Sequence, residues 1–208
     1  MNKQMYFGIK PYYVDIEEFI VNPKPKNVWQ LSYSNEDIKE LFILVFTQLN
    51  QFPLYVTFEY YDDDYSSAKE ELDRLGLEYS HIFIPQQRAR RMTYDEGLKD
   101  FTEVYFDILF FTVKVTDSKQ FKHLVNEYLI PYHHFIVSNQ DNIRFGPCFY
   151  KEDSITFHMD DTSTFGVKGH DICLISFFSN HYLNTNDFVK LFSKEIDIEM
   201  DIDEDEEE

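Results

Sequence analysis

Histidine and carboxylate side chains gather in one stretch of the sequence, between residues 158 and 171. His158 and Asp160 are two residues apart, so on a β-strand they share a face, and His170 follows across a turn-rich segment. An imidazole beside a carboxylate can bind a divalent cation or act as an acid–base pair. The spacing matches no established zinc or calcium motif, and polar residues on the wet face of a hairpin would look the same. A metal-dependent hydrolase centred on these three residues is therefore an alternative hypothesis.

Three further polar clusters have simpler explanations than catalysis. His133 and His134 are adjacent, and neighbours on a strand point to opposite faces, so their rings would not converge. The acidic run at 62–64 ends an apolar segment, a place where catalytic carboxylates often lie in α/β sheets, yet its last residue also suits a helix cap. The arginines of residues 88–91 could bind phosphate or an acidic surface, or pair with the chain's own carboxylates.

Established catalytic signatures do not occur in the sequence. It contains no Gly-x-Ser-x-Gly elbow, no Gly-x-Gly-x-x-Gly loop, no phosphate loop and no Cys-x-x-Cys pair, and it has six glycines in all. We therefore predict no catalytic residues, no metal and no cofactor, and a binding protein rather than an enzyme.

The charge of the chain indicates what kind of partner it would bind. There are 38 acidic and 19 basic residues, which gives a net charge of −19. Ten of the acids lie in residues 195–208, so the rest of the chain keeps 28 acids against 19 bases. Direct binding to nucleic acid is disfavoured because phosphate contacts need Lys and Arg. An acidic surface would instead speed encounter with a basic protein.

We therefore expect an acidic protein that inhibits or neutralises a basic, nucleic-acid-handling protein, as nuclease-toxin immunity proteins and phage anti-defence inhibitors do. Carboxylates would lie where the partner's DNA or RNA phosphates normally lie, which is a form of nucleic-acid mimicry. The predicted contact residues are Asp62, Asp63, Asp64, Glu70, Glu71, Asp197, Glu199, Asp201, Asp203, Glu204 and Asp205. A homo-oligomer using exposed tyrosines as anchors is a third hypothesis, with Tyr12, Tyr13, Tyr60, Tyr61 and Tyr65 as candidates.

The elements that would position these residues follow from a weak internal repeat. With an offset of 53 residues, 54–85 aligns with 107–138, and each copy has the pattern of strand, helix and strand. Helical spacing predicts a helix before each copy, over 35–51 and from Thr93 to Tyr105. Capping signals fall at Asp117 and at Ser67 with Glu70. The sequence thus predicts an α+β fold of repeated α-β-α-β units, arranged as ferredoxin-like split β-α-β units.

The C-terminal third has a different texture. Short strands are predicted at 143–150, 154–159 and 172–178, followed by a final helix over 184–195. Apolar and acidic residues alternate over 196–202, which predicts a strand with one dry face, and 203–208 is purely acidic, which predicts a solvated tail. We expect an α/β body over 1–138, a β-rich part over 139–202 of the same or a closely packed domain, and a tail over 203–208.

The cellular setting can also be predicted. No apolar run is long enough to span a bilayer, and the N-terminus lacks the apolar core of a signal peptide. Cys148 and Cys173 are two isolated cysteines, which do not amount to a disulfide framework. We expect a reduced, cytoplasmic protein that does not bind membranes.

Overall fold

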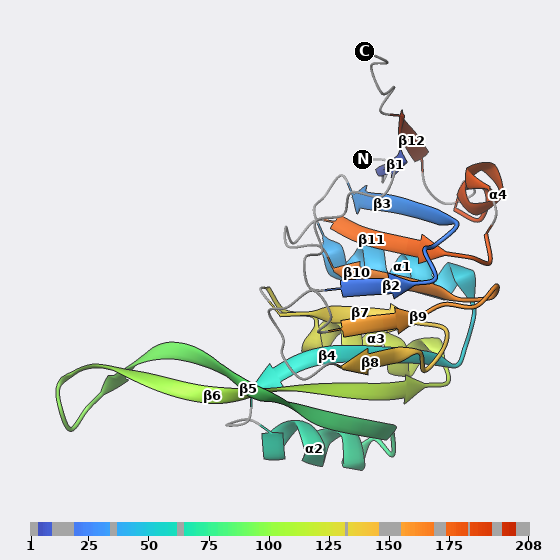
Figure 1. The fold of residues 1–208 in the computed structure, drawn as a ribbon. Helices are drawn as coiled ribbons and strands as arrows, with labels where there is room; N and C mark the ends of the chain where they lie inside the picture. Colours follow the sequence, from blue (N-terminus) through green and yellow to red (C-terminus); the bar gives the residue numbers. More distant parts are fainter. Residues whose placement is uncertain are drawn as a thin grey trace.

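A nine-stranded sheet organises the chain in a computed structural model, which describes residues 4–9, 19–33, 37–61, 65–131, 133–145, 155–168, 174–182, 184–192 and 197–202. Its strand order is β12-β1-β3-β11-β10-β7-β4-β6-β5 (Figure 1). The seven strands from β3 to β5 are antiparallel throughout, β1 is antiparallel to β3, and β12 is parallel to β1. A second sheet has the order β2-β9-β8. With four helices in the described part, the predicted α+β class is confirmed.

The elements run in chain order as follows. The first half contains β1 (Gln4–Ile9), β2 (Phe19–Asn22), β3 (Asn27–Tyr33), α1 (Ile38–Leu49), β4 (Leu54–Tyr61), α2 (Tyr65–Arg74), β5 (Glu78–Asp95) and β6 (Asp100–Val115). The second half contains α3 (Ser118–Tyr128), β7 (Phe135–Ser138), β8 (Ile143–Phe145), β9 (Ile155–His158), β10 (Thr164–Lys168), β11 (Leu174–Ser179), α4 (Thr185–Lys190) and β12 (Asp197–Ile202).

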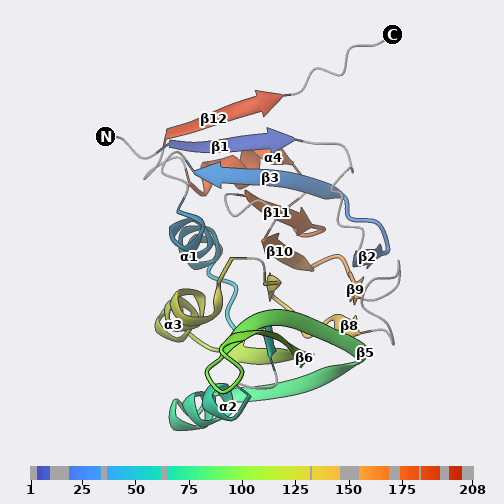
Figure 2. The ribbon, with the colours of Figure 1, turned by 90° about the vertical axis from the view of Figure 1, so that its left-hand side faces the viewer.

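The protein has three layers, which Figure 2 shows edge-on. The helices cover one face of the large sheet, and the core between them is rich in stacked aromatic rings, with Phe42, Phe46, Phe121 and Phe177 all fully buried. The three-stranded sheet covers the other face over a second core, in which the Phe165 ring stacks on those of Phe157 and Phe178 at centroid distances of 4.1 and 4.5 Å. Both faces of the middle strands are therefore dry, so their sequences are mostly apolar, and the few polar residues in them are buried.

The internal repeat corresponds to related elements in the structure. Helix α2 begins at Tyr65 and α3 at Ser118, which differ by the 53 residues of the sequence offset. Strands β4 and β5 lie parallel on either side of β6, while β6 and β7 lie parallel on either side of β4. The helix predicted before the second copy is wrong, because residues 93–95 and 100–105 belong to β5 and β6. Repeated α-β-α-β units are therefore not evident.

Helix ends were predicted with mixed success. Asp117 caps α3 as expected, since its carboxylate accepts the backbone N–H groups of Lys119 and Gln120. Ser67 lies inside α2 and does not cap it, which corrects the predicted capping box. Gly76 ends the helical segment with φ at +65°, a conformation that favours glycine.

The C-terminal part contributes strands to the middle of the large sheet. Strands β10 and β11 pair with each other and lie between β7 and β3. Two late strands are thus inserted between two strands that come earlier in the sequence. Strand β10 lies in a segment that we expected to be a turn-rich connection, and β2 was not predicted. The predicted strand at 196–202 is confirmed as β12.

Candidate functional site

A long β-hairpin projects from the body of the protein (Figure 1). It is formed by the outer parts of β5 and β6, beyond a register shift between Phe83 and Arg88. We call residues 88–107 the arm. Eight paired rows, from Arg88 opposite Asp107 to Asp95 opposite Asp100, carry it outward. At roughly 3.3 Å per residue the paired part is about 25 Å long.

The pairing register places the large apolar residues of the arm on one face. Directly opposed residues of an antiparallel pair share a face, and faces alternate along each strand. Tyr94 opposes Phe101, Met92 opposes Glu103, and Arg90 opposes Tyr105. These pairs are every second row of the ladder, so they lie on the same face. We define the apolar face of the arm as Met92, Tyr94, Phe101 and Tyr105.

The reverse face of the arm is more polar. Thr93 opposes Thr102 in the row between Met92 and Tyr94, and Val104 lies one row further in. The Thr102 hydroxyl donates to the backbone oxygen of Thr93 at 3.4 Å. Among the described side chains, aromatic rings and Met92 thus lie on one face and the smaller Thr93, Thr102 and Val104 on the other.

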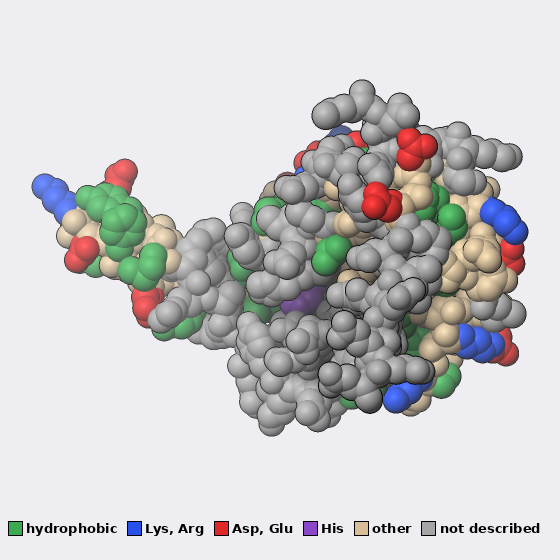
Figure 3. Space-filling model, turned by 90° about the horizontal axis from the view of Figure 1, so that it is seen from above, with side chains coloured by type: hydrophobic (Ala, Val, Ile, Leu, Met, Phe, Trp, Pro, Cys, Tyr) green, Lys and Arg blue, Asp and Glu red, His purple; other side chains and the backbone are tan. Residues whose placement is uncertain are grey.

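Solvent exposure distinguishes the apolar face from ordinary surface. Phe101 is 60% exposed, Met92 56% and Tyr94 51%, and Leu98 at the tip is 69% exposed. Figure 3 shows hydrophobic side chains clustered on the projecting end of the molecule. Contiguous exposed apolar residues with a polar rim are typical of interaction sites. The arm is thus a candidate binding surface.

Local polar contacts give the arm its shape. The Asp95 carboxylate accepts the backbone N–H groups of Gly97 (2.8 Å) and Leu98 (3.0 Å), which closes the turn at the tip. The Tyr105 hydroxyl donates to the Glu103 carboxylate at 2.8 Å. These bonds hold the tip and one edge of the apolar face in a defined conformation.

The structure places the predicted acidic contact residues in different settings. Glu70 is exposed on α2. Glu71 is engaged within the fold, since its carboxylate lies 2.7 Å from the Tyr128 hydroxyl and 2.9 Å from His123 Nε2. The hydrogen bond from Tyr128 leads the causes that hold the pKa of Glu71 below its ordinary value. Asp62, Asp63 and Asp64 and also Asp203, Glu204 and Asp205 lie outside the described residues.

Strand β12 holds the other predicted acids at an edge of the large sheet. Asp197 and Glu199 are exposed, while Ile198 between them packs against the main core. The backbone of Asp201 pairs opposite Gly8 of β1. From Asp197 to Glu199, the alternating pattern of the sequence thus matches one dry and one wet face, as expected of a strand.

Three of the five tyrosines considered as interface anchors pack against the cores of this chain. Tyr60 and Tyr65 pack against the core under the helices, and Tyr61 packs against the core under the small sheet. Tyr12 and Tyr13 lie outside the described residues. Among described residues, the exposed apolar side chains are concentrated on the arm instead.

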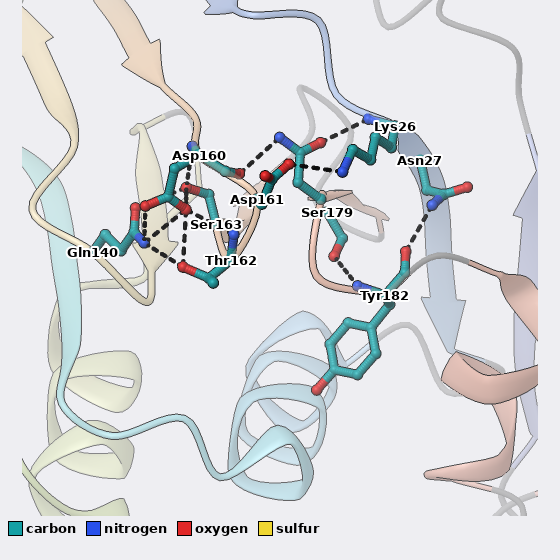
Figure 4. Close-up of polar contacts among 10 residues, drawn as sticks. Lys26, Asn27, Gln140, Asp160, Asp161, Thr162, Ser163, Ser179 and Tyr182 are labelled. Atoms are coloured by element: carbon teal, nitrogen blue, oxygen red, sulfur yellow. Dashed lines mark hydrogen bonds and ion pairs between the residues drawn. The ribbon is translucent and has the colours of Figure 1, made fainter.

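The candidate His–Asp cluster is arranged differently from the prediction. Strand β9 ends at His158, so Asp160 lies in the following turn rather than on a shared strand face. The Asp160 carboxylate accepts hydrogen bonds from Gln140, Ser163 and both the backbone and the hydroxyl of Thr162, at 2.7–3.0 Å (Figure 4). Led by the backbone N–H of Thr162, these donors lower the pKa of Asp160 to about 2. Asp160 therefore organises this turn.

The rest of this polar network links neighbouring loops. Lys26 forms an ion pair with Asp161 at 2.8 Å, and its backbone N–H donates to the Asn180 side chain. Asn180 in turn donates to the backbone oxygen of Asp160. His170, Cys148 and Cys173 lie outside the described residues. Within the part of the chain that the structure describes, no three His, Cys, Asp or Glu side chains are grouped as a metal site would require.

A buried acid–histidine pair lies at the end of two adjacent strands. The side chain of Glu59 on β4 is 8% exposed, and its carboxylate lies 2.7 Å from His134 Nδ1. It also accepts the backbone N–H of His134 at 3.1 Å. Burial alone would raise the pKa of Glu59, but the bonds and charge of His134 outweigh it and the pKa is lowered. His134 therefore pairs with a residue of the neighbouring strand within the fold.

Lys168 at the end of β10 is a second buried charged group. Its ammonium group donates to the backbone oxygen of Ile130 at 2.8 Å. Burial lowers the pKa of Lys168 to about 8, although the nearby charge of Glu59 acts in the opposite direction. Neither Lys168 nor Glu59 was singled out in the sequence, because each occurs alone in an apolar segment.

The arm is the main feature that sequence reasoning missed. Tyr94, Leu98, Phe101 and Tyr105 recur at helical spacing, which led to the incorrect helix. The same segment also carries a hairpin signal, since Asp95 and Gly97 form a turn sequence between runs rich in Thr, Val and aromatic residues. The enrichment of residues 101–106 in aromatic and β-branched residues would have favoured the strand.

Comparison with known proteins adds no relative. No protein-family model matches the chain, and no curated protein and no solved structure is significantly similar to it. Within the described residues, no helix is both long enough and apolar enough to cross a membrane. The function must therefore be argued from the arrangement of this chain's own residues.

Proposed function

We propose that this chain is a non-enzymatic acidic binding protein that neutralises a basic protein partner, of the nuclease-immunity or anti-defence type. The observation that carries the proposal is the position of Asp197 and Glu199, both exposed on the edge strand β12 and held in register by β1. Carboxylates fixed at a sheet edge are repeated along one face, as phosphates are along a strand of nucleic acid.

The charge balance supports this direction. A net charge of −19 accelerates encounter with a basic surface and disfavours binding to nucleic acid itself. The alternative of a metal-dependent hydrolase is less well supported, because the Asp160 carboxylate already accepts hydrogen bonds from Gln140, Thr162 and Ser163.

A finer description of the fold is also a proposal. We infer that 54–138 is a pair of interleaved split β-α-β units of ferredoxin-like type. The order β7-β4-β6-β5, with α2 joining β4 to β5 and α3 joining β6 to β7, supports it. So does the matched start of the two helices.

The test is binding to purified basic nucleases and defence proteins of the host, measured by calorimetry at low and at physiological salt. We expect binding that weakens as the salt concentration rises. At low salt, the double variant Asp197→Asn/Glu199→Gln should bind about fivefold more weakly than the unchanged protein. The control Glu127→Gln/Asp141→Asn makes the same charge change at exposed sites elsewhere. Equal weakening in both variants would show that only overall charge matters, and absence of salt-sensitive binding to every protein of the panel would refute the proposal.

The acidic tail needs a separate truncation. Removing everything after Glu195 also removes β12, which pairs with six residues of β1 and packs Ile198 on the core. Truncation after Ile202 keeps that strand and removes six acids. The comparison separates the contribution of the tail from damage to the sheet.

A further inference from the structure

We propose that the apolar face of the arm is a docking surface that inserts into an apolar groove of a protein partner whose rim carries Lys and Arg. This inference rests on the proposed function and adds to it the part of the chain that makes the apolar contact. The surface consists of Met92, Tyr94, Phe101 and Tyr105, with Leu98 at the tip.

Leaving this face in water costs the arm stability. A two-stranded hairpin is only marginally stable by itself, and the strands of the body are stable because helices and a second sheet cover them. On the arm, aromatic and apolar side chains on one face remain about half exposed or more. Covering them by a partner would recover the hydrophobic free energy that the arm lacks when exposed.

Two aromatic side chains of the apolar face are already arranged for binding. The rings of Tyr94 and Phe101 lie across the two strands at a centroid distance of 5.4 Å and an interplanar angle of 71°. Such an edge-to-face pair is a favourable geometry for aromatic side chains. Tyr and Phe lose little side-chain entropy when bound, so an ordered pair on a projecting hairpin can act as an anchor.

The charge of the arm favours a basic partner over a second copy of this chain. The outer half of the arm, residues 92–103, carries the exposed acids Glu96, Asp100 and Glu103 and one exposed base, Lys99, while Arg88, Arg90 and Arg91 belong to the half nearest the body. A second copy of this chain would bring the same excess of acid and a further net charge of −19. A groove with a basic rim instead complements both the carboxylates and the apolar face between them.

The test uses synthetic helical peptides as probes of this chemistry, labelled with fluorescein. One peptide has leucines on one face and arginines on the other, the second replaces each leucine by serine, and the third replaces each arginine by glutamate. We expect the Leu/Arg peptide to bind the full chain, and the other two to bind at least about tenfold more weakly.

The decisive variants change opposite faces of the arm. Tyr94→Ser/Phe101→Ser should weaken binding of the Leu/Arg peptide by about tenfold or more, whereas Thr93→Ser/Thr102→Ser on the reverse face of adjacent rows should leave it unchanged. Near-ultraviolet circular dichroism and thermal unfolding of both variants check that the body remains folded, which we expect because these residues lie outside both cores.

Each outcome bears on the proposal in a distinct way. Equal binding by wild type and Tyr94→Ser/Phe101→Ser, or no preference for the Leu/Arg peptide over the Ser/Arg peptide, would overturn it. Concentration-dependent self-association in sedimentation that disappears in the same double variant would assign the face to a second copy and also overturn it. Salt-sensitive binding of host proteins that survives Tyr94→Ser/Phe101→Ser would refute the docking role while leaving the proposed function standing.

Discussion

Tyr94 and Phe101 contact each other edge to face across the two strands of the arm, although both side chains are exposed. Elsewhere in the protein, stacked rings such as Phe157 and Phe165 lie inside a core. The arm therefore carries aromatic side chains of the kind found in the interior, but it holds them in an exposed position. This relationship is the basis of the docking surface proposed for the arm.

The buried pair of Glu59 and His134 should contribute strongly to stability. Replacing His134 with Ala leaves the Glu59 carboxylate buried without its ring partner, and we expect a loss of about 3 kcal/mol in the free energy of unfolding. Chemical denaturation at neutral pH measures the loss. The exposed His158 on β9 provides the control, and His158→Ala should change stability by less than about 0.5 kcal/mol.

The same pair gives a pH dependence whose sign can be stated. The pKa of Glu59 is lower in the folded state, so its contribution is present above the unfolded value of 4.5 and is lost as pH falls through the folded pKa. In Glu59→Gln this acid-dependent component should be absent. Unfolding curves collected from neutral pH down to the acid range would contradict the assignment if both proteins lost stability in parallel.

Lys168 should give a second pH effect, at alkaline rather than at acid pH. Its folded pKa of about 8 lies below the ordinary value of 10.5, so the folded state binds fewer protons between these values and stability should rise with pH there. Lys168→Met should remove this rise. The comparison is best made between about pH 8 and pH 10, before the tyrosines of the unfolded chain ionise.

Glu70 and Glu71 are adjacent on α2 but should respond differently to mutation. Glu71 accepts hydrogen bonds that join α2 to α3, so Glu71→Ala should cost about 1–2 kcal/mol of stability. Glu70 is exposed, and Glu70→Ala should leave stability nearly unchanged. Thermal unfolding of the two variants side by side tests this, and equal destabilisation would show that the α2–α3 contact is unimportant.

Gly166 on β10 allows close approach of helix α1 to the sheet. A Cβ at this position would lie 2.8 Å from Phe46 Cζ and 3.2 Å from a side-chain carbon of Ile175. Gly166→Ala should therefore destabilise the protein by about 1–3 kcal/mol through overpacking. Gly97→Ala at the tip of the arm is the control, because the nearest atom there is the end of the Asp95 side chain, which can move.

The sequence by itself determined most of the local structure. Amphipathic spacing and the Asp117 cap predicted α1 and α3, and strict alternation of apolar and acidic residues predicted β12. These signals work because each depends on a period or on a hydrogen bond between residues close in the chain. The 53-residue repeat likewise predicted two matching helices flanked by strands.

Tertiary structure decided the features on which function depends. Residues 93–105 fit a helix by periodicity and a hairpin by their turn residues, and the choice of strand follows from pairing along the whole length of β5 and β6. The Glu59–His134 pair joins residues 75 positions apart, and β10 lies between β7 and β11 although its segment resembles a loop. Such contacts depend on which segments meet across the sheet, and a local pattern contains no information about a partner so distant in the chain.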